Sequence, residues 1–153
     1  MPTSILLPID DSAFSRAALD VVALSIRPEA TAVHVLHVLE LDRMIPPALD
    51  FARGADYGAD VTAHLHAARS DAERLVEGAA DRLRRERFTV TTAVQEGDPR
   101  HAIIDCAAQR NCDCIVLGSH GRRGVDRLLL GSVSDAVSRH AHCSVYVVRS
   151  FAW

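Results

Sequence analysis

Five apolar runs alternate along the chain with segments in which apolar residues recur at intervals of three and four. Aliphatic and β-branched residues dominate the runs, which predicts strands, whereas the recurring spacing is that of one face of a helix. This alternation predicts a single α/β domain over residues 1–153, doubly wound around a mainly parallel five-stranded sheet with helices on both faces. The predicted strands span residues 4–9, 31–39, 88–94, 113–117 and 143–148.

Several helices have recognisable starts. Asp11 or Ser12 can cap the first helix, and Asp98 followed by Pro99 is typical of a helix start. The last helix is expected over residues 132–140. These signals place one helix after the first, third and fourth strands, and a long apolar stripe places another after the second.

The apolar positions of the first three helices define the faces that we expect to be buried. In the first helix these positions are Phe14, Ala17, Val21 and Leu24. In the second, a long helix with an Arg-rich outer face, they are Val61, Leu65, Ala68, Ala72, Val76, Ala79 and Leu83. In the third they are Ile103, Ile104, Ala107 and Ala108.

Residues 40–60 follow neither the strand pattern nor the helix pattern. Pro46-Pro47, Gly54 and Gly58 interrupt the segment. A connection of this length is unusual in a compact domain. It is expected to be either a lid that closes over a ligand or a mobile excursion from the fold.

Composition and charge exclude several classes of function. Apolar residues make up 48 % and charged residues 24 % of the chain, as in ordinary globular proteins. The net charge of −3 does not provide the basic surface on which nucleic-acid binding depends, and no apolar run approaches the roughly 20 residues of a membrane span. The N-terminus has no signal-peptide pattern, so we expect a cytoplasmic protein with its four cysteines reduced.

A glycine-rich stretch follows the fourth predicted strand. Gly118, Gly121, Gly131 and Ser132 are spaced as G-x2-G-x9-G-S. A strand that leads into such a turn and then into a helix start presents backbone N–H groups that converge on an anion. No Lys follows these glycines as a Walker loop requires, and both spacing and position differ from the Rossmann fingerprint. The stretch therefore predicts a phosphate-binding loop of another kind.

A second set of residues is expected beside this loop. In a doubly wound sheet the ligand lies beyond the carboxyl ends of the strands, where the winding changes direction. Asp10 follows the first predicted strand, residues 38–39 end the second, and Gly118 follows the fourth. Asp10 could instead cap the first helix, although Asp11 and Ser12 can fill that role. The fold rule therefore places Asp10 and the glycine-rich stretch at one edge of the sheet.

Four motifs together resemble the universal stress protein family: residues 6–12, His37-Val38, Gly97-Asp98-Pro99 and residues 118–134. The resemblance covers essentially the whole chain, and G-x2-G-x9-G-S is the signature of the family's ATP-binding branch. It implies a sheet in the order 3-2-1-4-5, ATP as the ligand with or without Mg²⁺, and a homodimer that pairs the last strands. In one departure, Ser144 stands where many members have Pro, which concerns only the entry into the last strand.

The resemblance also implies roles at the ends of the first two strands. Pro8 and Ile9 would line the base pocket, and the backbone of Val38 would meet the adenine. Asp10 would face the ribose or the phosphates. The glycine-rich stretch would wrap the ribose and phosphates and hold them through Gly118, Gly121, Gly131, Ser132, Val133 and Ser134.

Five further loop residues complete the predicted site. Ser119, His120 and Gly124 belong to the loop itself, together with two arginines. Arg122 and Arg123 are either forked donors to phosphate or solvated loop residues. His120 is either a weak acid or base or a residue that hydrogen bonds within the loop.

Three functions remain open. The first is an ATP-binding regulatory protein of the stress response that signals through its loop or dimer state to a partner protein of unknown identity. The second is a slow ATPase or an autophosphorylating enzyme with Ser132 or Ser134 as acceptor; with no Walker Lys and no evident base, no catalytic residue is assigned. The third is a thiol redox sensor through Cys112 and Cys114, a pair that packing on a buried strand also explains and that lacks the further ligands of a zinc site.

Overall fold

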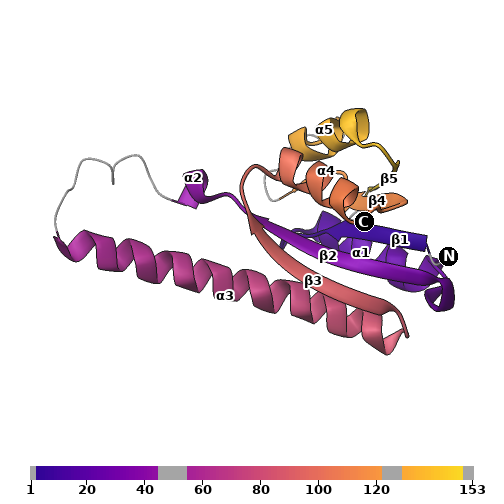
Figure 1. The fold of residues 1–153 in the computed structure, drawn as a ribbon, viewed down its shortest axis with the longest axis horizontal. Coiled ribbons are helices and arrows are strands. Elements are labelled where there is room, and N and C mark those ends of the chain that lie inside the picture. The colour runs from indigo at the N-terminus through magenta and orange to yellow at the C-terminus, as the bar shows by residue number, and fades with distance from the viewer. Residues whose placement is uncertain (1–2, 45–54, 122–128, 150–153) are drawn as a thin grey trace.

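The computed structural model describes residues 3–44, 55–121 and 129–149. Five strands form one parallel sheet in the order β3-β2-β1-β4-β5 (Figure 1), which confirms the predicted fold class and strand order. The strands are β1 (Thr3–Pro8), β2 (Thr31–Leu39), β3 (Thr89–Glu96), β4 (Cys114–Gly118) and β5 (Ser144–Val148). The helices are α1 (Ala13–Ser25), α2 (Leu41–Met44), α3 (Ala55–Arg85), α4 (Pro99–Gln109) and α5 (Ser132–His140), with a 3-10 turn η1 (Pro28–Ala30).

The sheet is covered on both faces, with α1 and α3 on one and α4 and α5 on the other (Figure 1). Successive residues of a strand point to opposite faces, so β1 serves both cores. Ile5 and Leu7 pack with residues of α1 and α3, whereas Leu6 packs with residues of α4 and α5. All three side chains are almost fully buried. The near-continuous apolar run of β1 therefore reflects a central strand that is buried on both faces of the sheet.

The predicted face of α1 is partly wrong, since Ala17 and Val21 pack against the core as expected but Leu24 does not. Its buried residues are Ser15, Ala18, Val22 and Ala23, whereas Leu24 is 76 % exposed. Apolar residues surround most of this helix, so their spacing could not decide which side turns inward. The small residues face the sheet and allow close approach, and a Cβ atom on Gly118 of β4 would lie only 2.7 Å from the backbone carbonyl carbon of Phe14.

The predicted face of α4 is also partly wrong. Ile103 and Ala107 are buried as expected, but the third buried residue is Cys106, while Ala108 is exposed and Ile104 is partly buried. Cysteine behaves in a core as a small apolar residue, which the apolar spacing alone did not take into account.

The expectation of an irregular segment over residues 40–60 is wrong at both of its ends. Helix α2 occupies Leu41–Met44, and α3 already begins at Ala55. Residues 45–54 lie outside the described residues, and with them the question of a lid.

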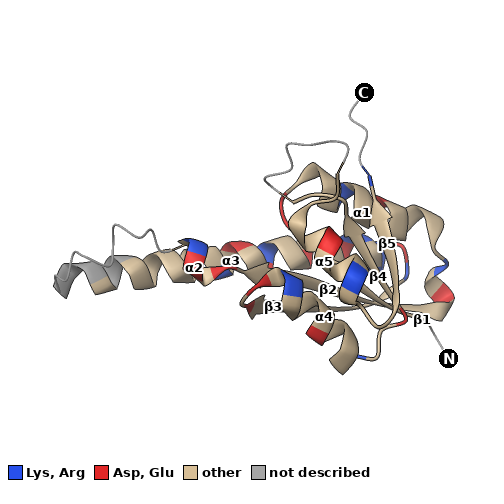
Figure 2. Cartoon of the chain, turned by 90° about the horizontal axis from the view of Figure 1, so that it is seen from above, with Lys and Arg blue, Asp and Glu red and all other residues tan. Residues whose placement is uncertain are grey.

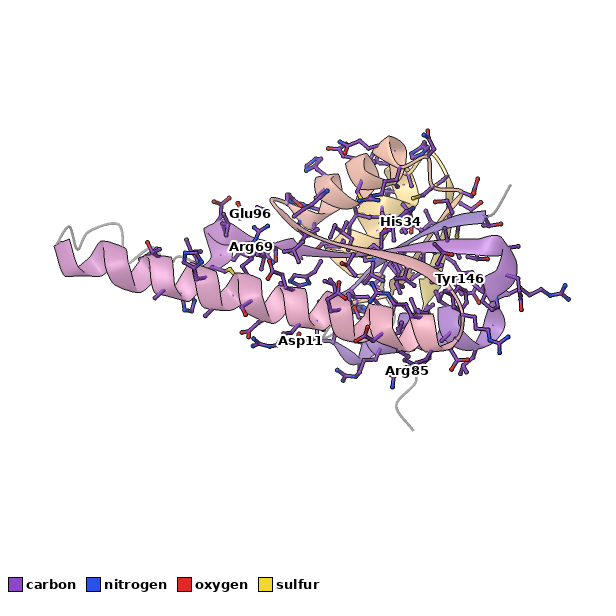
Figure 3. All side chains as sticks on the ribbon, turned by 60° about the horizontal axis from the view of Figure 1, so that its bottom comes forward. Asp11, His34, Arg69, Arg85, Glu96 and Tyr146 are labelled. Atoms are coloured by element: carbon purple, nitrogen blue, oxygen red, sulfur yellow. The ribbon has the colours of Figure 1, made fainter. Side chains whose placement is uncertain are left out.

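Helix α3 extends far beyond the sheet (Figures 1 and 2). Its 31 residues span about 46 Å, whereas the nine residues of β2 span about 30 Å. Only the part that packs on the sheet buries its predicted face fully, at Ala72, Val76, Ala79 and Leu83; Val61, Leu65 and Ala68 are partly buried. Near the point where the helix leaves the sheet, Arg69 Nη1 lies 3.0 Å from Glu96 Oε1 at the end of β3 (Figure 3). Of the helices within the described ranges, none is long and apolar enough to cross a bilayer.

Candidate functional site

Asp10 lies directly after β1 and is held by a short network at the start of α1. Its Oδ1 accepts hydrogen bonds from the Ser12 N–H at 2.9 Å and from the Ser15 hydroxyl at 2.8 Å. The Ser15 Oγ in turn accepts the Asp10 N–H at 2.9 Å. The side chain of Asp10 therefore has a defined orientation, which the buried Ser15 sets. Sequence reasoning missed Ser15, since a serine on a helix face gives no sign of its partner.

Ser12, and not Asp10, caps α1. The Ser12 hydroxyl accepts the N–H of Ser15 at 3.2 Å, so the N-cap alternatives left open by the sequence resolve to this residue. The second oxygen of Asp10 faces the glycine-rich stretch, because a Cβ atom on Gly121 would lie 2.9 Å from Asp10 Oδ2. The structure thus brings Asp10 and Gly121 together at one edge of the sheet, as the fold rule predicts.

Ser119 connects three elements at this edge. Its N–H donates to the carbonyl of Val148 at 2.8 Å, which ties the end of β4 to the end of β5. Its carbonyl accepts the Gly131 N–H at 2.8 Å and the Ser134 hydroxyl at 2.7 Å, which ties the same loop to the start of α5. Ser119 and Ser134 are each only 2 % exposed. These bonds fix where the first turn of α5 lies relative to β4.

The first turn of α5 has no side-chain cap. Gly131 occupies the N-cap position, and its own N–H and the Ser134 hydroxyl are already bonded to Ser119. Among the described residues, the N–H groups of Ser132 and Val133 make no hydrogen bond, and Ser132 is exposed. A helix N-terminus carries a partial positive charge on such groups. The start of α5 therefore offers these two N–H groups and the Ser132 hydroxyl to an anion.

His120 is packed into the loop. Its Nδ1 lies 3.1 Å from the Ser119 hydroxyl, and its ring lies against Phe14 with the ring centroids 5.1 Å apart. This geometry favours the interpretation of His120 as a residue that hydrogen bonds within the loop. Arg122, Arg123 and Gly124 lie outside the described residues.

The remaining predicted residues lie where β1 and β2 end. The pairing of these strands runs to Pro8 and Leu36, after which the Ile9 N–H donates to the Leu36 carbonyl at 2.8 Å. Pro8 and Ile9 are buried, and Val38, two residues beyond Leu36, is partly buried. These positions share the carboxyl edge of the sheet with Asp10.

The thiols and histidines elsewhere do not form a second site. Burial raises the pKa of Cys112, Cys114 and Cys143, which keeps these thiols protonated and weighs against a thiol sensor. His34 (Figure 3) contacts the hydroxyl of Thr91, and burial together with the charge of Arg110 lowers its pKa. Within the described ranges, no three His, Cys, Asp or Glu side chains are grouped so that they could hold a metal ion.

The fold described above is that of a known class of α/β proteins. A model of the Universal stress protein family matches residues 1–149. The chain therefore belongs to the universal stress protein family.

Relatives and solved structures agree with this membership. The chain is 26 % identical to Universal stress protein YxiE of Bacillus subtilis over 151 residues, which cover 97 % of this chain and all of the relative. A local match to Universal stress protein MJ0531 of Methanocaldococcus jannaschii is 42 % identical over 60 residues, 39 % of this chain and 35 % of that protein. The structure of hypothetical protein MJ0577 superimposes with a TM-score of 0.82 at 27 % identity and covers all of this chain and 99 % of its own.

Two more distant structures of the same fold contain adenine nucleotides. A universal stress protein in complex with cAMP is 19 % identical, with a TM-score of 0.59, and the match covers 95 % of each chain. A universal stress protein family protein of Arabidopsis thaliana with AMP bound is 17 % identical, with a TM-score of 0.64, and the match covers 99 % of this chain and 93 % of the other. At these identities the likeness to this chain shows the fold alone.

Proposed function

We propose that this protein binds an adenine nucleotide, ATP, at the carboxyl edge of the sheet and acts as a regulatory protein. The observation that carries the proposal is that Asp10 lies close to Gly121 at the same edge as the N-terminus of α5, which has no side-chain cap. A carboxylate and free helix N–H groups at one edge suit a ligand with both hydroxyl and phosphate groups. The AMP and cAMP complexes of two proteins with this fold support the same kind of ligand.

Different residues at this edge suit different parts of the nucleotide. Asp10 suits the ribose hydroxyls, since a carboxylate accepts hydrogen bonds from hydroxyl groups but repels phosphate. The phosphates fit the N–H groups of Ser132 and Val133 and the hydroxyl of Ser132. Gly118 contributes by letting β4 lie close to α1, whereas Gly121 leaves open the space in front of Asp10. The base would lie against Pro8, Ile9 and Val38.

The regulatory interpretation is preferred to the enzymatic one. Ser132 is the exposed hydroxyl placed to accept a phosphoryl group in an autophosphorylating protein. However, His120 already contacts the Ser119 hydroxyl, and Asp10 is held by Ser12 and Ser15 in an orientation that suits the ribose hydroxyls. Phosphate release from ATP, measured with the protein and with a non-binding variant, separates the two functions.

A homodimer through β5 belongs to the same proposal. Strand β5 is one edge of the sheet, and Tyr146 on it is 56 % exposed (Figure 3). An edge strand with an exposed aromatic side chain suits pairing with a second copy. Sedimentation or light scattering of the purified protein, with and without ATP, measures this association.

Gly121→Val tests the site directly. A branched side chain at this position would meet the Asp10 carboxylate and fill the space in front of it, so we expect ATP affinity to fall at least about a hundredfold. Isothermal titration with ATP, in the presence and absence of Mg²⁺, measures the loss. Gly78→Val is the matched control, because a Cβ atom on Gly78 of α3 meets nothing within 4 Å. Equal affinities of G121V and wild type would refute the proposed site.

A further inference from the structure

The hydrogen bonding between β1 and β2 changes at Ile9. The Ile9 N–H still follows the pattern of a parallel ladder and donates to the Leu36 carbonyl at 2.8 Å. In that pattern the carbonyl of the same residue accepts the N–H of the residue two positions further along the partner strand. The expected donor to the Ile9 carbonyl is therefore Val38.

A side chain takes the place of this backbone donor. The Nδ1 atom of His37 lies 2.7 Å from the Ile9 carbonyl oxygen, and the His37 side chain is buried. Because a carbonyl only accepts, Nδ1 carries the hydrogen of this bond. Among the described residues, no backbone hydrogen bond joins Val38 to Ile9. The imidazole thus satisfies the carbonyl that Val38 would otherwise bind.

The free groups of Val38 point in a defined direction. The Leu39 carbonyl accepts the Gly97 N–H at 3.0 Å, so the backbone groups of Leu39 face the β3 side. Backbone groups of successive strand residues point to opposite sides, and those of Leu36 face β1. The N–H and C=O of Val38 therefore face the β1 side just beyond Ile9, at the edge where the nucleotide is proposed to lie.

We propose that His37 is a positioning residue that keeps the backbone N–H and C=O of Val38 free to pair with an adenine base. The inference rests on the proposed function. One residue with a free donor beside a free acceptor matches the N1 acceptor and the N6 amino donor of adenine. Inosine presents a carbonyl at position 6 and an N–H at position 1, which is the reverse pattern. His37 thereby sets the preference of the site for adenine.

Hydrogen exchange in the ligand-free protein tests the first half of this inference. His37→Leu removes the donor, so the Ile9 carbonyl recruits the Val38 N–H, and we expect exchange of that amide to slow at least about tenfold. His37→Asn is the conservative control, because its side-chain amide nitrogen occupies the position of Nδ1 and retains the fast exchange of wild type. Unchanged exchange in H37L would overturn the inference. His37→Met is a second donor-free variant for use if H37L does not fold.

Titration with ATP and ITP tests the second half. Wild type and H37N are expected to prefer ATP, whereas H37L loses roughly tenfold in affinity for ATP and little for ITP, as expected for one lost hydrogen bond. An equal loss for both nucleotides would mean that His37 only supports the fold, and would overturn the inference. If wild type binds neither nucleotide, the proposed function fails, while the exchange rates of Val38 still decide whether His37 frees that amide.

Discussion

Two helices that cover the same face of the sheet begin in opposite ways. Helix α4 starts with Asp98, whose Oδ1 accepts the Arg100 N–H at 2.9 Å, followed by Pro99, which has no N–H to satisfy. Helix α5 starts with Gly131, which has no side chain to cap its first turn. Helix α4 satisfies its own N-terminus, whereas α5 leaves N–H groups for an external acceptor.

The comparison shows that the availability of a polar group depends on its partners. Ser134 carries a hydroxyl within the predicted phosphate-binding stretch, but this hydroxyl is buried and donates to Ser119. Ser132, two residues earlier, is exposed. We infer that the phosphate contacts of α5 are made by Ser132 and Val133, while Ser134 holds the helix start in place.

The largest effect is expected from placing a carboxylate at the first residue of α5, next to its N-cap, as Asp98 places one at the N-cap of α4. Ser132→Asp places a carboxylate at the helix N-terminus, where it competes with the phosphates and repels them. We expect ATP affinity to fall roughly a hundredfold, about 2.7 kcal/mol, and the free energy of unfolding without ligand to rise by about 0.5 kcal/mol. Titration calorimetry and urea unfolding measure the two changes.

Ser138→Asp is the control for net charge, since Ser138 is exposed in the last part of the same helix. It should leave ATP affinity within about twofold of wild type, because a charge near the C-terminal end of α5 has little effect on a ligand at the first turn. If S138D and S132D weakened binding equally, the phosphates would not lie at the start of α5.

A smaller effect separates the two serines of the first turn. Ser134→Ala removes the hydroxyl that donates to the Ser119 carbonyl, so we expect the free energy of unfolding to fall by about 1–2 kcal/mol with ATP affinity nearly unchanged. Ser132→Ala should do the reverse, lowering affinity about threefold without a change in stability. A loss of affinity in S134A at unchanged stability would assign the phosphate contact to Ser134 instead.

The smallest effect concerns the capped helix. Hydrogen bonding to Arg100 lowers the pKa of Asp98 from 3.8 to about 2, so the native state favours the ionised carboxylate. This stabilisation is fully present above pH 3.8 and is lost as the pH falls toward 2. Because the pair is largely solvent-exposed, it contributes about 1 kcal/mol or less.

Asp98→Asn should therefore lower the free energy of unfolding slightly at neutral pH, and its difference from wild type should vanish as the pH falls through this range. Urea unfolding at several pH values measures the difference. ATP affinity should not change, since the N-terminus of α4 is not part of the proposed nucleotide site. A pH-independent difference would assign the effect to packing and not to the charge of Asp98.

Features that depend on neighbouring residues in the chain were predicted well. Helix α5 has the predicted bounds, and Asp98 and Pro99 start α4 as expected, because capping and proline geometry act over a few residues. The buried face of α1 was predicted only in part, since its apolar residues occupy more than one side of the helix. The close approach of α1 to Gly118 is a tertiary contact that apolar spacing does not reveal.

The candidate site shows the same division. The order of strands and the glycine spacing were sufficient to place Asp10, Val38 and the glycine-rich stretch at one edge, because parallel strands end together. Tertiary structure decided which polar atoms remain free there. Ser15 orients Asp10, Ser119 binds Ser134, and His37 replaces Val38 at the Ile9 carbonyl. Each of these contacts joins groups from different elements or turns, and only the folded chain brings such atoms within hydrogen-bonding distance.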